Sequence, residues 1–194
     1  MAKITFILGG ARSGKSSYAL KLAREYGGRV AFIATCQPLD AEMKKRIGLH
    51  KKSRPTQWQT FEEPKDAASL LKKIGAKFDT IIIDCLTLMV CNLMMDNQGE
   101  AAVEKKLKDM LNTLDKTNAN AIIVSNEVGL GIVPGNKLGR EFRDIAGRIN
   151  QIVASRANEV FFMVAGLPMN IKKEGAIKKG ERRGYKEEKE RFKE

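Results

Sequence analysis

The segment GGARSGKS, residues 9–16, has the residue types and spacing that bind nucleotide phosphates. It matches the P-loop pattern, in which two glycines five positions apart are followed by lysine and then serine or threonine. Glycines let the backbone turn its N–H groups toward phosphate oxygens, and the helix that follows presents its positive end to the same anion. We therefore expect Lys15 to reach the β and γ phosphates and Ser16 to hold Mg²⁺. A glycine-rich turn that fits by chance is the less favoured alternative.

A carboxylate that could complete a magnesium site lies in TIIIDC, residues 80–85. Asp84 ends a run of β-branched residues, and the acidic metal-binding residue of P-loop proteins stands at the end of such a strand. An aspartate that only caps the following helix is the alternative. Given the P-loop, we favour the metal role for Ser16 and Asp84 together.

His50 is the only histidine of the chain and lies among four cations: Arg46, Lys51, Lys52 and Arg54. Neighbouring cations disfavour the imidazolium form, so a neutral imidazole is expected, with a lone pair that could attack phosphorus. The same cations could stabilise a departing pyrophosphate. These features suggest a nucleophile beside a bound polyphosphate.

A structural role for His50 is equally compatible with the residues. Met43, Ile47 and His50 fall at i, i+4 and i+7, which places them on one face of a helix and predicts a packed histidine. Gly48 weakens that helix just before His50. From the residues alone the nucleophilic and structural roles remain about even.

Strands and helices alternate along the sequence and must position these groups. Apolar runs predict strands at 3–8, 29–34, 79–85, 120–126 and 159–166. Helical spacing and capping residues predict helices at 15–26, 40–51, 63–76, 87–95, 100–117 and 137–157. This order predicts an α/β fold with a mostly parallel sheet and helices on both faces.

Length and composition fit one domain, which we expect to span residues 1–171. Residues 172–194 form a basic tail rich in charge and glycine, expected to be disordered. Three cysteines without a C-x-x-C pair suggest reduced thiols in a cytoplasmic protein. No apolar run is long enough for a membrane span. The net charge of +12 invites a nucleic-acid interpretation, but few aromatic residues are present to stack bases.

Four segments together resemble the bifunctional adenosylcobinamide kinase / adenosylcobinamide-phosphate guanylyltransferase family of cobalamin biosynthesis. They are GGARSGKS, the stretch ATCQPLDAEMKKRIGLHKKSRPTQWQTFEEP, IIIDCLTLMVCNLM, and VSNEVGLGIVPGNKLGREFRDIAGRINQIVA. The likeness runs from about Ile4 to Lys172, and its H-x-x-x-R-P-x-x-W and N-E-V-G-x-G-I-V-P elements are more specific than the P-loop.

This resemblance implies a RecA-like P-loop fold, a homotrimer and two reactions. ATP or GTP would phosphorylate the aminopropanol hydroxyl of adenosylcobinamide. GTP would then guanylylate His50, and GMP would pass to adenosylcobinamide phosphate, giving adenosylcobinamide-GDP and pyrophosphate. Two other hypotheses are a P-loop kinase for another small molecule, with a structural His50, and, less favoured, a nucleic-acid-binding ATPase.

The resemblance also implies a set of nucleotide contacts with GTP or ATP, with His50 as the catalytic residue. The matched positions are Gly9, Gly10, Ala11, Arg12, Ser13, Gly14, Lys15, Ser16, Ala34, Thr35, Cys36, Lys51, Lys52, Ser53, Arg54, Glu62 and Asp84. Cys36 is a poor hydrogen-bond donor, which argues against a side-chain role there. The contact of Glu62 depends on the resemblance only.

Further residues lie near the expected site, and three of them have two possible roles each. Asn126 and Glu127 end a strand on the expected active-site side, and Glu127 is either a base for the cobinamide hydroxyl or a loop-stabilising carboxylate. Arg140 and Arg143 could reach a phosphate across a subunit boundary, although a solvated or ion-paired helix face is favoured. The uncharged stretch 85–95 is expected in the core rather than against the corrin.

Overall fold

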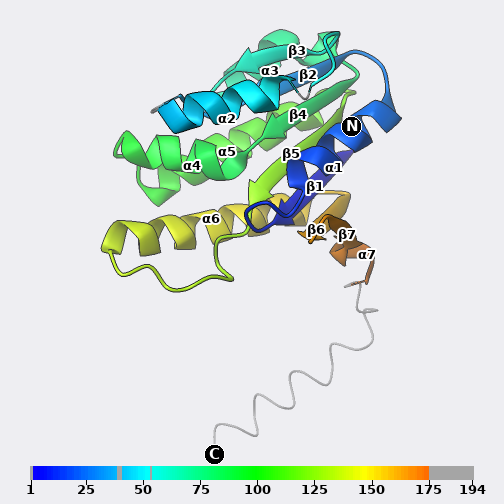
Figure 1. Ribbon diagram of the computed structural model, residues 1–194. Helices are drawn as coiled ribbons and strands as arrows, with labels where there is room; N and C mark the ends of the chain where they lie inside the picture. The colour runs from blue at the N-terminus through cyan, green and yellow to red at the C-terminus, as the bar shows by residue number, and fades with distance from the viewer. Residues whose placement is uncertain (1, 39–40, 53, 175–194) are drawn as a thin grey trace, which may run out of the picture.

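The computed structural model describes residues 2–38, 41–52 and 54–174. Within them, a seven-stranded sheet in the order β3-β2-β4-β5-β1-β6-β7 forms the centre of the molecule (Figure 1). Neighbouring strands are parallel, except that β6 and β7 are antiparallel. The strands are β1 (Ile4–Gly9), β2 (Val30–Ala34), β3 (Gln59–Glu62), β4 (Thr80–Asp84), β5 (Asn120–Asn126), β6 (Glu159–Val164) and β7 (Leu167–Asn170).

Helices cover both faces of this sheet. Buried residues of α1 pack on one face, and those of α3, α4, α5 and α6 pack on the other. A short 3-10 turn, η1 (Gly75–Lys77), follows α3. The helices are α1 (Lys15–Tyr26), α2 (Ala41–Lys52), α3 (Ala67–Ile74), α4 (Leu86–Met95), α5 (Glu100–Asp115), α6 (Lys137–Arg156) and α7 (Ile171–Glu174).

The central strands are mostly apolar along both faces because both of their faces are buried. In β4, Ile81 and Ile83 join the core under α3 to α6, whereas Ile82 packs on the α1 side. All three side chains are fully buried. The predicted α/β class, with a mostly parallel sheet covered on both faces, is confirmed.

Two strands at opposite edges of the sheet were not predicted from sequence. β3 is four residues long, QTFE, and mostly exposed, so it lacks the apolar run that marks a buried strand. β7 contains Pro168, which is tolerated only at sheet edges because proline cannot donate to the ladder. The prediction of five strands was therefore too low by these two edge strands.

One helix begins later than predicted. The helix expected at 63–76 starts at Ala67, because the side chain of Asp66 accepts a hydrogen bond from the Ser69 N–H and caps α3. Glu63 accepts the N–H groups of Lys65 and Asp66 in the turn before it. The other predicted helices agree with the structure to within two residues at each end.

The carboxyl ends of β1, β4 and β5 meet at one edge of the sheet because these strands are parallel. β1 leads into the P-loop, β4 ends at Asp84, and β5 ends at Asn126. In the ladder Gly9 pairs with Asn126, and Asp84 pairs with Val124. Ligands of open α/β folds bind outside this edge of the sheet, so the fold brings the predicted residues to the expected place.

The chain continues as helix past the predicted domain boundary at residue 171. Lys172 lies in α7, and its ammonium donates to the carbonyl of Ala154 at 3.0 Å. The rest of the predicted tail, residues 175–194, lies outside the described residues. None of the helices in the described part of the chain combines the length and hydrophobicity that a bilayer crossing requires.

Candidate active site

The P-loop closes on itself between β1 and α1. Gly14, directly before the helix, has a φ of 93°, which side chains other than glycine rarely tolerate. The Ser13 N–H donates to the Gly10 carbonyl at 3.3 Å, and the Ser13 carbonyl accepts the Gly166 N–H at 3.1 Å. The loop is thus held from within and by the turn between β6 and β7.

Lys15 is buried at the centre of this loop, with 8% of its surface exposed. Its ammonium donates to the Gly10 carbonyl at 2.6 Å and to the Ser13 hydroxyl at 3.4 Å. Burial lowers the pKa of Lys15, because a charged group loses water there, although the nearby Asp84 carboxylate opposes this shift. A phosphate beside Lys15 would compensate that lost hydration.

Ser16 and Asp84 form the predicted metal-binding pair. The Ser16 hydroxyl donates to Asp84 Oδ2 at 2.9 Å. Mg²⁺ in nucleotide sites takes one or two protein oxygens and completes its shell with phosphates and water. No cluster of three or more acidic, histidine or cysteine ligands occurs in the described residues, so this hydroxyl and carboxylate fit a phosphate-bridged Mg²⁺ rather than a protein cage.

Two hydrogen bonds with Thr35 hold the backbone of Cys85, the residue after Asp84. The Thr35 hydroxyl donates to the Cys85 carbonyl at 2.7 Å and accepts the Cys85 N–H at 2.8 Å. The Asn92 amide donates to the Thr35 carbonyl at 2.8 Å. These hydrogen bonds join the end of β2 to the end of β4. Thr35 is fully buried and does not line the cavity. Burial raises the pKa of Cys85 to about 12, which keeps this thiol neutral.

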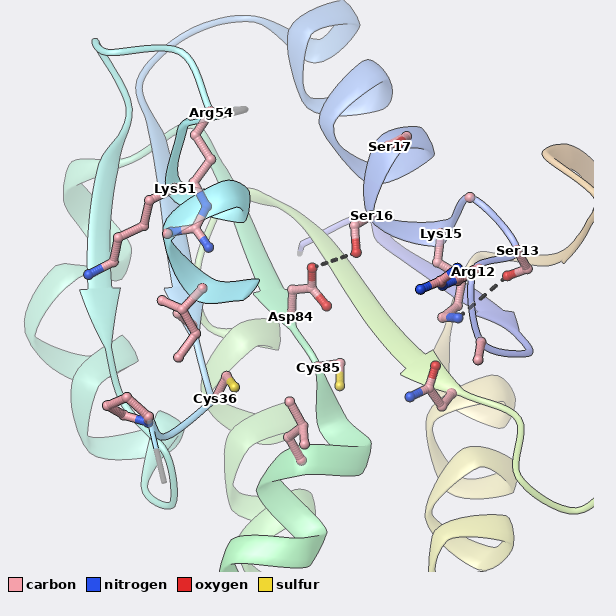
Figure 2. Close-up of a pocket in the computed structure, with 18 of the residues that line it drawn as sticks. Arg12, Ser13, Lys15, Ser16, Ser17, Cys36, Lys51, Arg54, Asp84 and Cys85 are labelled. Atoms are coloured by element: carbon pink, nitrogen blue, oxygen red, sulfur yellow. Dashed lines mark hydrogen bonds between the residues drawn. The ribbon is translucent and has the colours of Figure 1, made fainter. Parts of the chain in front are cut away.

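A cavity of about 830 Å³ opens in front of these residues. Figure 2 shows the P-loop residues on one side of it, Lys51 and Arg54 on the other, and Asp84 and Cys85 between them. Twelve of the predicted contacts line it: Ala11, Arg12, Ser13, Gly14, Lys15, Ser16, Ala34, Cys36, Lys51, Arg54, Glu62 and Asp84. The fold therefore brings together residues that are up to 73 positions apart in the sequence (Ala11 to Asp84).

One face of α2 also lines this cavity. Its lining residues are Lys44, Ile47, Gly48 and Lys51, at i, i+3, i+4 and i+7. Lys44, Ile47 and Gly48 were not among the predicted contacts. Their helical spacing from Lys51 is the signal that could have identified them.

Arg54 lies against an aromatic ring at the far wall of the cavity. Its Cζ is 3.6 Å from the centre of the Phe32 ring, and Nη1 donates to the Thr60 hydroxyl at 3.2 Å. Burial lowers the pKa of Arg54, while the carboxylates of Asp84 and Glu62 oppose this effect. Beside it, Lys51 and Glu62 form an ion pair of 2.5 Å. Arg54 is thus oriented by stacking, and Lys51 by Glu62.

Some predicted residues lie elsewhere or outside the description. Gly9 and Gly10 belong to the loop but do not line the cavity. The backbone of His50 lies in α2, next to Lys51, whereas the side chains of His50 and Lys52 lie outside the described structure. Ser53 lies outside it entirely.

The contacts of the residues with two possible roles bear on the choice between those roles. The Glu127 carboxylate accepts the Gly129 N–H at 2.7 Å and does not line the cavity, which supports the loop-stabilising role. Arg140 donates to the carbonyls of Pro134 and Gly135 and so holds the same loop. Arg143 lines a separate cavity of about 340 Å³ beside α6. Asn126 does line the main cavity.

Most of the uncharged stretch 85–95 belongs to the core, although Met95 at its end is 64% exposed. Leu86, Met89, Val90 and Leu93 are all at most 2% exposed. Four additional cavity residues were not singled out from sequence as contacts, namely Ser17, Pro38, Cys85 and Leu88. They lie within a few residues after the P-loop, β2 or β4, where no local pattern distinguishes them from their neighbours. Only the geometry of the sheet edge identifies them as cavity residues.

Comparison with protein families gives one match over most of the chain. Residues 5–171 match the family model described as cobinamide kinase / cobinamide phosphate guanyltransferase. The chain is 43% identical, over 87% of its length and 96% of the relative, to the bifunctional adenosylcobalamin biosynthesis protein CobP of Pseudomonas aeruginosa. It is 42% identical to CobU of Salmonella typhimurium, which bears the same description, over 86% of the chain and 98% of that protein.

Solved structures support the fold assignment. A KaiC-like protein from the hyperthermophilic archaeon Pyrococcus horikoshii matches with a TM-score of 0.50 and 16% identity, covering 82% of this chain and 70% of that one. At this identity the likeness concerns the fold alone. The predicted RecA-like P-loop architecture is confirmed.

Proposed function

Since the chain belongs to the cobinamide kinase / cobinamide phosphate guanyltransferase family, and is thereby a bifunctional enzyme of cobalamin biosynthesis, we propose that His50 is its covalent guanylyl carrier. The observation that carries this proposal is the face of α2. Lys44 and Lys51, on the same helix as His50, line one cavity with the P-loop lysine. The helix that bears the imidazole therefore contributes cations to the place where a triphosphate would lie.

The first reaction transfers a phosphoryl group. The acceptor is the aminopropanol hydroxyl of adenosylcobinamide, and the donor is ATP or GTP. The hydroxyl oxygen bonds to the γ-phosphorus as the bridge to the β-phosphate breaks, and the hydroxyl proton is released. Lys15 and the loop N–H groups bind the phosphates, and Ser16 with Asp84 would hold Mg²⁺, which neutralises charge on the β and γ oxygens.

The second reaction transfers GMP in two displacements. The unprotonated nitrogen of His50 attacks the α-phosphorus of GTP, and pyrophosphate leaves. A phosphate oxygen of adenosylcobinamide phosphate then attacks the same phosphorus, the phosphorus–nitrogen bond breaks, and adenosylcobinamide-GDP forms. Lys44, Lys51 and Arg54 line the wall beside α2 and would stabilise the charge on the departing pyrophosphate.

The test is incubation with GTP labelled at the α-phosphate, without cobinamide. We expect stoichiometric labelling of the protein in a bond that is labile in acid and stable in base, with release of one pyrophosphate for each label. His50→Asn should abolish the label. Lys45→Ala is the matched control, because Lys45 is an exposed residue of α2 that does not line the cavity. Labelling of His50→Asn at the wild-type level would refute the carrier role.

We also propose a cytoplasmic homotrimer. Exposed apolar side chains on and after the β5–α6 loop support an interface between copies: Leu130, Ile132, Val133 and Leu138 are all more than half exposed. Light scattering should give three times the chain mass of 21.6 kDa. Ile132→Asp, a residue 96% exposed, should shift the particle toward monomer without loss of helix content. A monomeric wild type would contradict this proposal.

A further inference from the structure

Asn126 presents a polar side chain to the cavity from the strand between the P-loop strand and the strand of Asp84. It is the last residue of β5 and is partly exposed. The residue lines the cavity. Because Asp84 pairs with Val124 in the sheet, Asn126 lies two residues further along β5 toward the cavity.

The backbone of Asn126 is fixed on both sides by buried side chains. Its N–H donates to the Thr87 hydroxyl at 2.7 Å, and that hydroxyl also bonds the Ser125 hydroxyl at 3.0 Å. Its carbonyl accepts from the Asn150 amide at 3.3 Å. Thr87, Ser125 and Asn150 are each at most 5% exposed. Residues of α4 and α6 thus fix the backbone at the end of β5. This restricts the positions that the Asn126 amide can take.

The Asn150 side chain that bonds Asn126 also brings an unsatisfied polar atom into the core. Its Oδ1 is the one buried side-chain polar atom without a hydrogen-bond partner in the described residues. An apolar side chain of similar size would avoid that unsatisfied carbonyl but would not hold the Asn126 carbonyl. Sequences depart from the most stable choice mainly at functional positions. The presence of this amide therefore points to a role for the residue that it supports.

The chemistry of an amide suits a phosphoryl oxygen. Its NH₂ group donates hydrogen bonds without adding charge. Two carboxylates line the cavity, and both are engaged: Asp84 with Ser16, and Glu62 with Lys51. Asn126 stands on the P-loop side of Asp84, whereas α2 follows β2 on the other side of β4. A group at this position lies beside the phosphates bound by Lys15 and away from the helix of His50.

We propose that the Asn126 amide donates a hydrogen bond to an oxygen of the γ-phosphoryl group and stabilises it during transfer to the hydroxyl, with Asn150 as its positioning residue. The inference rests on the proposed function because it assigns Asn126 to the kinase step. Transfer of GMP breaks a bond at the α-phosphorus, on the α2 side, and depends on Asn126 much less. Substitution of Asn126 should therefore affect the kinase reaction much more than the transfer of GMP, although both reactions use one cavity.

The experiment compares two labels in the same variants. Asn126→Ala should lower kcat for transfer of γ-labelled phosphate to adenosylcobinamide by about 10²-fold, the usual effect of removing one donor to a transition-state oxygen. At saturating GTP, labelling of the protein by α-labelled GTP should change by no more than about threefold, because this donor does not face the α-phosphorus. Asn120→Ala is the matched control, at the opposite end of β5 and outside the cavity. Equal losses in both reactions, or no loss in the kinase reaction, would overturn the inference.

Asn150→Leu tests the positioning role. It should change Tm little, since removal of the unsatisfied carbonyl offsets loss of the hydrogen bond to Asn126, and should still lower kcat of the kinase reaction by about tenfold. A KM that stays constant would show that substrate binding is intact. Wild-type kcat in Asn150→Leu would refute the positioning role.

Nucleotide binding distinguishes failure of this inference from failure of the proposed function. Asn126→Ala should lose affinity for GTP by about tenfold while its affinity for GDP, which lacks the γ-phosphate, stays constant. This measurement needs no corrinoid. If the wild-type enzyme left adenosylcobinamide unmodified, the proposed function would fail, yet the GTP-to-GDP ratio would still support or refute the contact of Asn126.

Discussion

Ser16, in the first turn of α1, donates a hydrogen bond of 2.9 Å to Asp84 at the end of β4. These two residues follow strands that are not adjacent in the sheet, because β5 lies between β1 and β4. Their contact therefore joins the phosphate loop to the second wall of the cavity. It also places a hydroxyl and a carboxylate at the distance that two ligands of one metal ion need.

Asp84→Asn should reduce both reactions by 10² or more, because an amide neither neutralises nor orients Mg²⁺ as a carboxylate does. The mutant should also need a higher Mg²⁺ concentration for half-maximal activity. Titration of each activity with Mg²⁺ measures this. Asp109→Asn, on the exposed surface of α5, is the control. An unchanged Mg²⁺ requirement in Asp84→Asn would show that this carboxylate is not a ligand.

Gly9→Ala should destabilise the fold by about 1–3 kcal/mol and weaken nucleotide binding. A Cβ at Gly9 would lie 2.6 Å from the Met163 carbonyl, which is part of β6 and cannot move, at a φ of 153°. Gly10→Ala is the neighbouring control, since a Cβ there meets nothing within 4 Å. Urea unfolding gives the two free energies. Equal stabilities would contradict the steric explanation.

Arg54→Lys should lower the rate of protein guanylylation by about tenfold although the charge is kept. Lysine lacks the planar group that stacks on Phe32 and donates to Thr60 at the same time. Phe32→Leu removes the stacking ring, keeps an apolar side chain at this core position and leaves the Arg54 guanidinium in place, so it should give a smaller loss of rate. Single-turnover labelling with α-labelled GTP measures both variants. Arg24→Lys, at the exposed end of α1, should be neutral.

Asp66→Asn should remove a pH-dependent part of the stability. The hydrogen bonds that the carboxylate accepts from Ser69, with smaller contributions from Lys106 and Lys72, lower the pKa of Asp66 in the folded protein. A lowered carboxyl pKa contributes stability that is present above about pH 4, the pKa of the unfolded chain, and is lost as pH falls through the folded value.

The stability difference between wild type and Asp66→Asn should therefore be at most about 1 kcal/mol at pH 7 and should disappear near pH 2. Asparagine keeps most of the cap hydrogen bond, so the difference isolates the charge. Urea unfolding at several pH values measures it. A difference that persists at pH 2 would show that the charge of Asp66 is not its origin.

The sequence predicted the buried part of the fold well because that part leaves a local signal. Glycine spacing from Gly9 to Lys15 and the apolar run that ends at Asp84 both identify a strand end next to a ligand site. β3 and β7 leave no such signal, since edge strands need not be apolar on both faces. Local patterns thus identify central strands and miss the strands at the rim.

The candidate site was predicted less completely because the residues that support its lining residues are far from them in the sequence. Thr35, inferred as a nucleotide contact from the resemblance, instead bonds Cys85 at a separation of 50 residues. Asn126 was noticed as the end of a strand, but its support comes from Thr87 and Asn150 on two other elements. No spacing within one helix or strand carries that information. Only the packed sheet brings these side chains together.

The chain is held against the sheet on both sides of the helix that carries His50. Before α2, the Thr35 hydroxyl bonds the backbone of Cys85, and after it, Arg54 stacks on Phe32 of β2. The loop between these two contacts is closed by folding, so a bound nucleotide does not have to meet the entropy cost of that closure.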